Sequence, residues 1–87
     1  MPYINRDQRP LLDGAIAGFV YAQGYTPGEM NYILTRLLLL WRPPLQSRYE
    51  DHQAVIGLLE CVKAEYIERV LRPYEDRKLS DNGDVYA

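Results

Sequence analysis

The most constraining feature of this 87-residue chain is the segment 33–41, which reads Ile-Leu-Thr-Arg-Leu-Leu-Leu-Leu-Trp. Four successive leucines extend over more than one helical turn, so a helix that contains them is apolar on every side. Such a helix must be covered on several faces. An 87-residue chain has few other elements to provide that cover. We therefore expect a second copy of the chain, or another partner, to supply it, and the assembly we predict is a homo-oligomer.

Size and residue usage also favour association. A chain this short forms one domain and buries only about 60–65% of the surface that its unfolded form exposes. Cys61 is the only cysteine, so no disulfide can form within the chain, and His52 is the only histidine, which excludes a zinc site built from cysteines and histidines. Because both kinds of cross-link are absent, association is the remaining route to stability.

Charge and composition exclude some functions. A net charge of −2 and a pI of about 5.3 argue against nonspecific binding of nucleic acid. The beginning of the chain does not read as a signal peptide, and its apolar runs are too short to span a bilayer, so we expect a cytoplasmic protein without membrane contact. Eight tyrosines and eight arginines are present. Both residue types are enriched at protein interfaces, and both stack on flat ligands.

The chain reads as an all-α protomer with three helices, because no pair of segments alternates as strands do. An N-terminal arm of residues 1–8 comes first, and Asp7 is expected to cap a first helix that ends near Gly24. Gly14 and Gly18 lie four residues apart on this helix. We interpret them as a site of tight helix packing inside the protomer.

The second helix has the clearest boundaries. The segment 26–29, Thr-Pro-Gly-Glu, has the capping-box pattern with proline in the first turn, and two prolines at positions 43 and 44 end the helical pattern. The sequence therefore predicts a helix over 27–41. We expect its leucines and tryptophan to form the buried centre of the assembly, with these oligomer-interface residues: Leu37, Leu38, Leu40 and Trp41.

The third helix is predicted to be long. The segment 47–50, Ser-Arg-Tyr-Glu, repeats the capping-box pattern, and apolar residues follow at helical spacing up to Val70. Glutamate and arginine stand four residues apart at 65 and 69 and again at 68 and 72. Such pairs stabilise the solvent-facing side of a helix. Pro73 is expected to kink this helix. A C-terminal arm, residues 80–87, completes a single helical domain that covers residues 1–87, with a strand-like segment at 84–86.

Three stretches resemble one known family. They are 56–66 (Ile-Gly-Leu-Leu-Glu-Cys-Val-Lys-Ala-Glu-Tyr), 73–78 (Pro-Tyr-Glu-Asp-Arg-Lys) and 82–86 (Asn-Gly-Asp-Val-Tyr). The pattern is similar to that of a family of short, functionally uncharacterised proteins encoded by bacteriophages and some bacterial genomes. Members also tend to begin Met-Pro-Tyr-Ile and to carry an asparagine and a tyrosine ahead of an arginine, here Asn31, Tyr32 and Arg36. The resemblance implies a phage or prophage origin and action in the bacterial cytoplasm, but no activity.

Two enzymatic interpretations fit poorly. A magnesium-dependent nucleotide pyrophosphohydrolase needs rigidly placed carboxylates. The chain offers Glu65 and Glu68 on a helix, with Asp81 and Asp84 only in a glycine-containing tail. A thiol enzyme is rejected because we expect Cys61 within the apolar face of the third helix, with the only histidine too distant along that helix. We predict no catalytic residue, metal ligand or cofactor.

Binding of a small molecule is the more concrete hypothesis. Clefts between helices at protomer interfaces are favoured ligand sites, where tyrosines stack on rings, arginine or lysine neutralises phosphate and asparagine reads a base edge. The candidate residues are Asn31, Tyr32, Arg36, Tyr66, Arg69, Tyr74, Lys78 and Asn82. The predicted function is sequestration of a nucleotide-derived host-defence signal, of the cyclic nucleotide or ADP-ribose type. The alternative is a host-protein-binding or structural assembly protein, in which the same groups only hold chains together.

Overall fold

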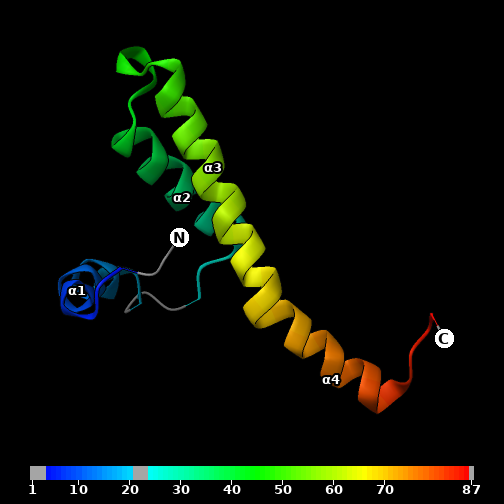
Figure 1. The fold of residues 1–87 in the computed structure, drawn as a ribbon. Coiled ribbons are helices and arrows are strands. Elements are labelled where there is room, and N and C mark those ends of the chain that lie inside the picture. The colour runs from blue at the N-terminus through cyan, green and yellow to red at the C-terminus, as the bar shows by residue number, and fades with distance from the viewer. Residues whose placement is uncertain (1–3, 21–23, 87) are drawn as a thin grey trace. The chain divides into compact units, whose positions relative to one another are not determined.

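The computed structural model describes residues 4–20 and 24–86, and all the regular structure in these ranges is helical. The main helices are α1 (Arg9–Val20), α2 (Pro27–Trp41), α3 (Tyr49–Tyr66) and α4 (Arg72–Asn82). Single 3₁₀ turns, η1 (Arg6–Gln8) and η2 (Pro44–Gln46), precede α1 and follow α2 (Figure 1). A π-helical turn, η3 (Ile67–Leu71), joins α3 to α4, which gives a third helical region of 34 residues. The predicted all-α class with three helices and a long last one is confirmed.

The first helix differs from its prediction at two places. Asp7 lies inside the 3₁₀ turn η1 and is not the cap of α1, which begins at Arg9. A Cβ atom added at Gly14 or Gly18 would meet nothing within 4 Å among the neighbours that the structure describes. The expected tight packing at these glycines inside the protomer is therefore wrong for this part of the chain.

The second helix begins and ends where the sequence predicts. The Thr26 hydroxyl accepts a hydrogen bond from the backbone N–H of Glu29 at 3.1 Å, and the Glu29 carboxylate accepts one from the backbone N–H of Thr26 at 2.8 Å. These two bonds satisfy donors that a helix N-terminus otherwise leaves free. The helix ends at Trp41, and the prolines at 43 and 44 cannot continue its ladder because they lack an N–H group.

The third helical region continues past Pro73. The proline ring lacks an N–H and excludes the carbonyl of Arg69, four residues earlier. In place of an end, the helix widens over Ile67–Leu71, and the N–H of Arg72 donates to the carbonyl of Ile67, five residues back. The discontinuity that Pro73 imposes therefore takes the form of a π-turn that precedes it.

The helix then extends further than expected, to Asn82 inside the predicted C-terminal arm. Gly83 ends it with φ +87° and ψ 151°, a conformation that is essentially restricted to glycine. The predicted stop at Asn82-Gly83 is confirmed. After it, the backbone N–H of Tyr86 donates to the Asp84 carboxylate at 2.8 Å, which makes a turn and not the expected strand-like segment.

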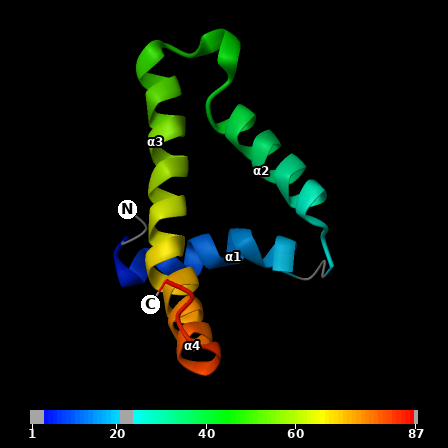
Figure 2. The same cartoon turned by 90° about the vertical axis from the view of Figure 1, so that its right-hand side faces the viewer.

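No side chain in the described ranges is fully buried. Large apolar residues of every helix are exposed, including Leu40 of α2 at 68%. The chain consists of two units, Met1–Val55 and Ile56–Ala87, and the second contains the long helix from Ile56 onward with its terminal turn. Figure 2 gives a second view of these helices. None of the helices in the described part of the chain is long and apolar enough to cross a membrane.

Candidate functional site

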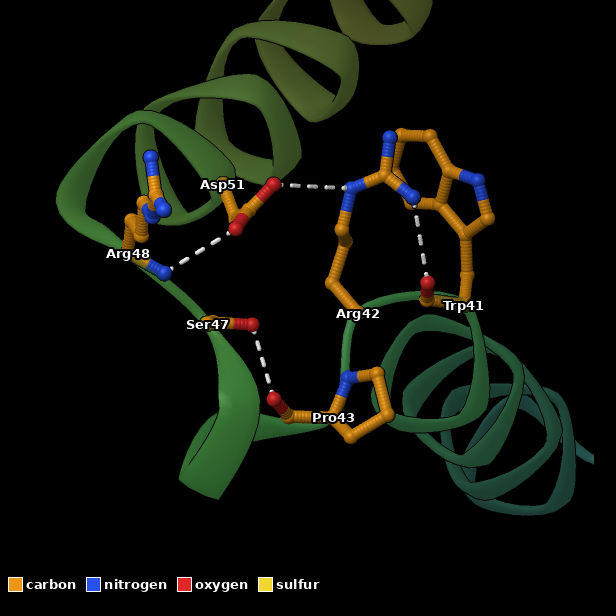
Figure 3. A network of polar contacts seen from close by, with 6 residues as sticks. All are labelled: Trp41, Arg42, Pro43, Ser47, Arg48 and Asp51. Carbon is orange, nitrogen blue, oxygen red and sulfur yellow. Dashed lines mark hydrogen bonds and ion pairs between the residues drawn. The ribbon is translucent and has the colours of Figure 1, made fainter.

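A set of polar contacts connects the end of α2 to the start of α3. We call residues 41–51 the α2–α3 corner. Nε of Arg42 lies 3.3 Å from Oδ1 of Asp51, and the guanidinium of Arg42 also donates to the Trp41 carbonyl at 3.2 Å (Figure 3). The Nε atom is buried and makes no hydrogen bond. In the described structure, the charge of the Asp51 carboxylate compensates for its burial. The corner is thus fixed by a charge pair between two helices.

The start of α3 is capped differently from the prediction. The Ser47 hydroxyl donates to the carbonyl of Pro43 at 2.7 Å and does not cap the helix. The other oxygen of Asp51 accepts from the backbone N–H of Arg48 at 2.9 Å, as Figure 3 shows. Because α3 begins at Tyr49, its third residue is Asp51 and not Glu50. The expected Ser47–Glu50 capping box is therefore wrong, and Asp51 fills the acidic position.

The four predicted interface residues all lie in the last turns of α2. The Arg42 guanidinium stacks over the ring of Trp41, 4.0 Å from its centroid, and covers one face of the ring. Leu38 is half-buried, whereas Leu37, Leu40 and Trp41 are exposed. This end of α2 therefore presents apolar side chains that the described chain leaves largely uncovered. Whether they meet another protomer remains a prediction.

The ligand residues predicted on α2 lie on a shallow part of the surface. Tyr32 lines an open hollow of about 530 Å³ at the start of the helix, together with Tyr25 and the capping-box residue Glu29. The carbonyl and side-chain oxygen of Asn31 lie 2.7 and 3.4 Å from the Thr35 hydroxyl. Arg36 does not line this hollow. The three predicted residues therefore share a helix but not a pocket.

A second hollow lies beside the π-turn, with a volume of about 480 Å³. Its lining includes Glu65, Glu68 and Arg69. The predicted pairs at this place are confirmed: Arg69 lies 3.8 Å from Glu65, and Arg72 lies 2.9 Å from Glu68. Arg69 therefore faces a carboxylate of its own helix, which competes with any phosphate for the guanidinium.

Of the remaining predicted residues, Tyr66 is exposed at the end of α3, and the other three lie on α4. The exposed ring of Tyr74 has Lys78 Nζ at 5.7 Å from its centroid and the Arg77 guanidinium at 5.9 Å. Both distances are within the range of cation–π attraction. Lys78 and Asn82 line a third open hollow of about 410 Å³, which the terminal turn completes. Within this unit, the structure thus brings Tyr74, Lys78 and Asn82 to the same end of the long helix.

Charge limits what these hollows can bind. The terminal hollow carries Glu75, Asp76 and Asp84 against the single cation Lys78. The other two hollows also have more carboxylates than cations in their linings. A phosphate entering any of them meets net repulsion. The Tyr74 face of α4, with its two cations, is the more suitable surface for an anion.

The residues considered for catalysis lie along the third helical region and its terminal turn. Cys61 is exposed in the single chain, and His52 is exposed as well. Glu65 and Glu68 are paired with arginines. Across residues 4–20 and 24–86, no group of three or more histidine, cysteine, aspartate or glutamate side chains is placed to hold a metal ion.

Comparison with known families gives one result. The family described as "Domain of unknown function (DUF6899)" matches residues 1–85. The chain belongs to the DUF6899 family. Comparisons with curated proteins and with solved structures give no match. Membership confirms the expected relation to a family of uncharacterised proteins over nearly the whole chain, and it assigns no activity.

Sequence reasoning missed two features of this DUF6899 chain. The first is the Arg42–Asp51 pair, whose signal is an arginine just after α2 and an aspartate in the first turn of α3. The second is Arg77 beside Tyr74, which a search for cations three residues from an aromatic ring on a helix would have found.

Proposed function

We propose that this chain is a non-catalytic binding protein that acts as a homo-oligomer and captures a flat, anionic ligand at protomer interfaces. One observation carries the proposal: no described side chain is buried, while large apolar residues are exposed on every helix. A patch of exposed apolar surface of this kind marks an interaction site in a natural protein. Association therefore supplies the core that the single chain lacks.

The ligand class follows from the charged face of α4. Tyr74 offers an exposed ring for stacking, and Arg77 and Lys78 stand within 6 Å of that ring as partners for phosphate. A nucleotide-derived molecule has both a flat base and phosphates. The hollows within the protomer have acidic linings, which repel such an anion. The proposed binding surface is therefore one that another copy completes. The phage resemblance suggests a cyclic nucleotide or ADP-ribose type of host-defence signal in the bacterial cytoplasm.

Calorimetry of the native assembly tests this function. The probes are cyclic dinucleotides, cyclic trinucleotides and ADP-ribose. We expect one of them to bind the wild-type protein, and Tyr74→Leu or Lys78→Gln to abolish the heat of binding. Tyr49→Leu is the matched control, because Tyr49 is an exposed tyrosine in the first turn of α3. If no probe binds, or if all three variants behave alike, the ligand part of the proposal is wrong.

A second candidate function is binding of a host protein. It is favoured by the terminal turn, where Val85 and Tyr86 are 90% and 95% exposed beside the acidic hollow. Exposed aromatic side chains often anchor protein interfaces. A pull-down from bacterial lysate with the intact chain, compared with Tyr86→Ser, separates the candidates. A stoichiometric protein band that needs Tyr86 favours this second function, whereas a small molecule released by heat favours the first.

A further inference from the structure

We propose that one stripe of the long helix is the surface on which a second copy of this chain packs, and that the π-turn keeps this stripe in register. The stripe, called the long-helix seam, consists of Leu59, Val62, Tyr66, Val70 and Tyr74. The inference rests on the proposed homo-oligomer and specifies the surface through which two copies contact each other. All five residues belong to the unit Ile56–Ala87.

The seam has an unusual spacing. An α-helical seam stays on one face when apolar residues alternate at spacings of three and four. Here the first two spacings are three, from Leu59 to Val62, and four, to Tyr66. The next two, to Val70 and Tyr74, are four again. In a regular α-helix each spacing of four overshoots a full turn by about 40°, so Tyr74 would lie about 120° from Val62.

The π-turn removes this drift. A turn closed by a bond from residue i to i+5 contains one residue more than an α-helical turn. The turn Ile67–Leu71 contains Val70, and Arg72 N–H bonds to the Ile67 carbonyl in this five-residue pattern. The step from Tyr66 to Val70 is therefore equivalent to three α-helical residues. The sequence of spacings becomes three, four, three, four, which is the pattern of a continuous seam.

The seam is exposed along its whole length. The exposed fractions are 45% for Leu59, 58% for Val62, 61% for Tyr66, 48% for Val70 and 49% for Tyr74. A single helix cannot cover its own stripe, and this unit contains no other helix. The charges beside Tyr66 and Val70 are matched within the helix, because Glu65 pairs with Arg69 and Glu68 with Arg72. An apolar seam with internally paired charges fits another copy of itself better than a charged partner.

The exposed area is sufficient for such an interface. The chain exposes 8067 Å². A standard interface covers about 800 Å² on each partner. Pairing of identical chains through identical seams is the arrangement found in most homodimers.

Two deletions, both in a Pro73→Ala background, test the role of the π-turn. Removing Glu68 from the turn leaves a regular helix and shortens the spacing from Tyr66 to Val70 to three, so the seam spacings alternate between three and four. We therefore expect this variant to form an assembly of the wild-type mass in analytical ultracentrifugation. Removing Ala64, an exposed residue on the opposite face of α3, gives spacings of three, three, four and four. These leave Val70 and Tyr74 in place relative to Leu59 but rotate Tyr66, the middle residue of the seam, away by about 100°. The dissociation constant then rises by at least about tenfold, because apolar side chains lose their cover. Equal masses for the two variants would overturn the inference.

Point variants keep the test valid if a deletion fails to fold. Tyr66→Glu places a charge on the seam and dissociates the assembly, whereas Ala64→Glu places the same charge on the opposite face and does not. Circular dichroism verifies that both remain helical. An oligomeric wild type that Tyr66→Glu leaves intact rejects the seam but not the proposed oligomer. A compact monomeric wild type rejects both.

Discussion

The carboxylate of Asp51 lies 3.3 Å from Nε of Arg42 and joins the end of α2 to the start of α3. The same carboxylate accepts the backbone N–H of Arg48, so one side chain both caps α3 and connects its first turn to the end of α2. The two side chains are each 36% exposed, which places the pair between a surface bridge and a buried one.

We expect Asp51→Ala to destabilise the α2–α3 corner by about 1–2 kcal/mol, because it removes both a helix cap and an ion pair. Trp41 is the only tryptophan, and Arg42 stacks on its ring. Tryptophan fluorescence during urea unfolding therefore reports directly on this corner. Glu50→Ala is the matched control, since Asp51 and not Glu50 caps α3. Equal unfolding midpoints for the two variants would contradict the assigned role of Asp51.

The capping box of α2 predicts a dependence on pH. The backbone N–H of Thr26, and then its hydroxyl, lower the pKa of Glu29 below its usual value of 4.5. The charged carboxylate therefore stabilises the folded state. Its contribution is complete above about pH 4.5 and is lost as the pH falls through the lower pKa of the folded state.

Glu29→Gln tests this contribution. The amide oxygen can still accept the Thr26 N–H, but it does not titrate. We expect the loss of thermal stability between about pH 7 and about pH 3 to be smaller in this variant than in the wild type. Circular dichroism at 222 nm measures the melting temperatures. Because other carboxylates also titrate, Glu50→Gln is the reference, and an identical pH response in both variants would show that the capping box does not contribute.

The sequence predicted the elements that depend on local chemistry. The bounds of α2 follow from a capping box and two prolines, and the pairs Glu65–Arg69 and Glu68–Arg72 follow from spacing on one helix. The cap of α3 was misplaced by one residue because Glu50 and Asp51 compete for the same acidic position, and only the course of the chain after Pro43 decides between them.

The candidate site was less predictable. Residue type alone marked eight ligand residues, but chemical suitability does not determine which of them share a surface. Tyr74 and Lys78 meet because they lie four residues apart on α4, and Arg36 does not line the hollow at Tyr32 because nothing local requires it. The π-turn was also missed, since a proline within a helical pattern usually indicates a kink or an end.

Two glycines of the long helix are expected to respond in opposite directions to alanine. Gly83 has φ +87° and ψ 151°, so Gly83→Ala costs about 1–3 kcal/mol at the end of α4. Gly57 is within α3, and a Cβ there would meet nothing within 4 Å in the described structure, so Gly57→Ala stabilises the helix by up to about 1 kcal/mol. Amide hydrogen exchange resolves the two effects: faster exchange over residues 79–83 in the first variant and slower exchange around residue 57 in the second. Unchanged exchange near residue 83 would mean that the left-handed stop is not maintained in solution.

Leu38 is expected to be the most sensitive apolar residue of α2, because it is half-buried while its neighbours Leu37 and Leu40 are exposed. Leu38→Asp places a charge where the assembly is expected to have its centre, and burial of an unpaired charge is strongly unfavourable. We predict unfolded or aggregated protein. Leu38→Met conserves volume and should cost less than about 1.5 kcal/mol. Light scattering combined with circular dichroism distinguishes the outcomes. A soluble, helical, monomeric Leu38→Asp protein would show that α2 is not the centre of an assembly.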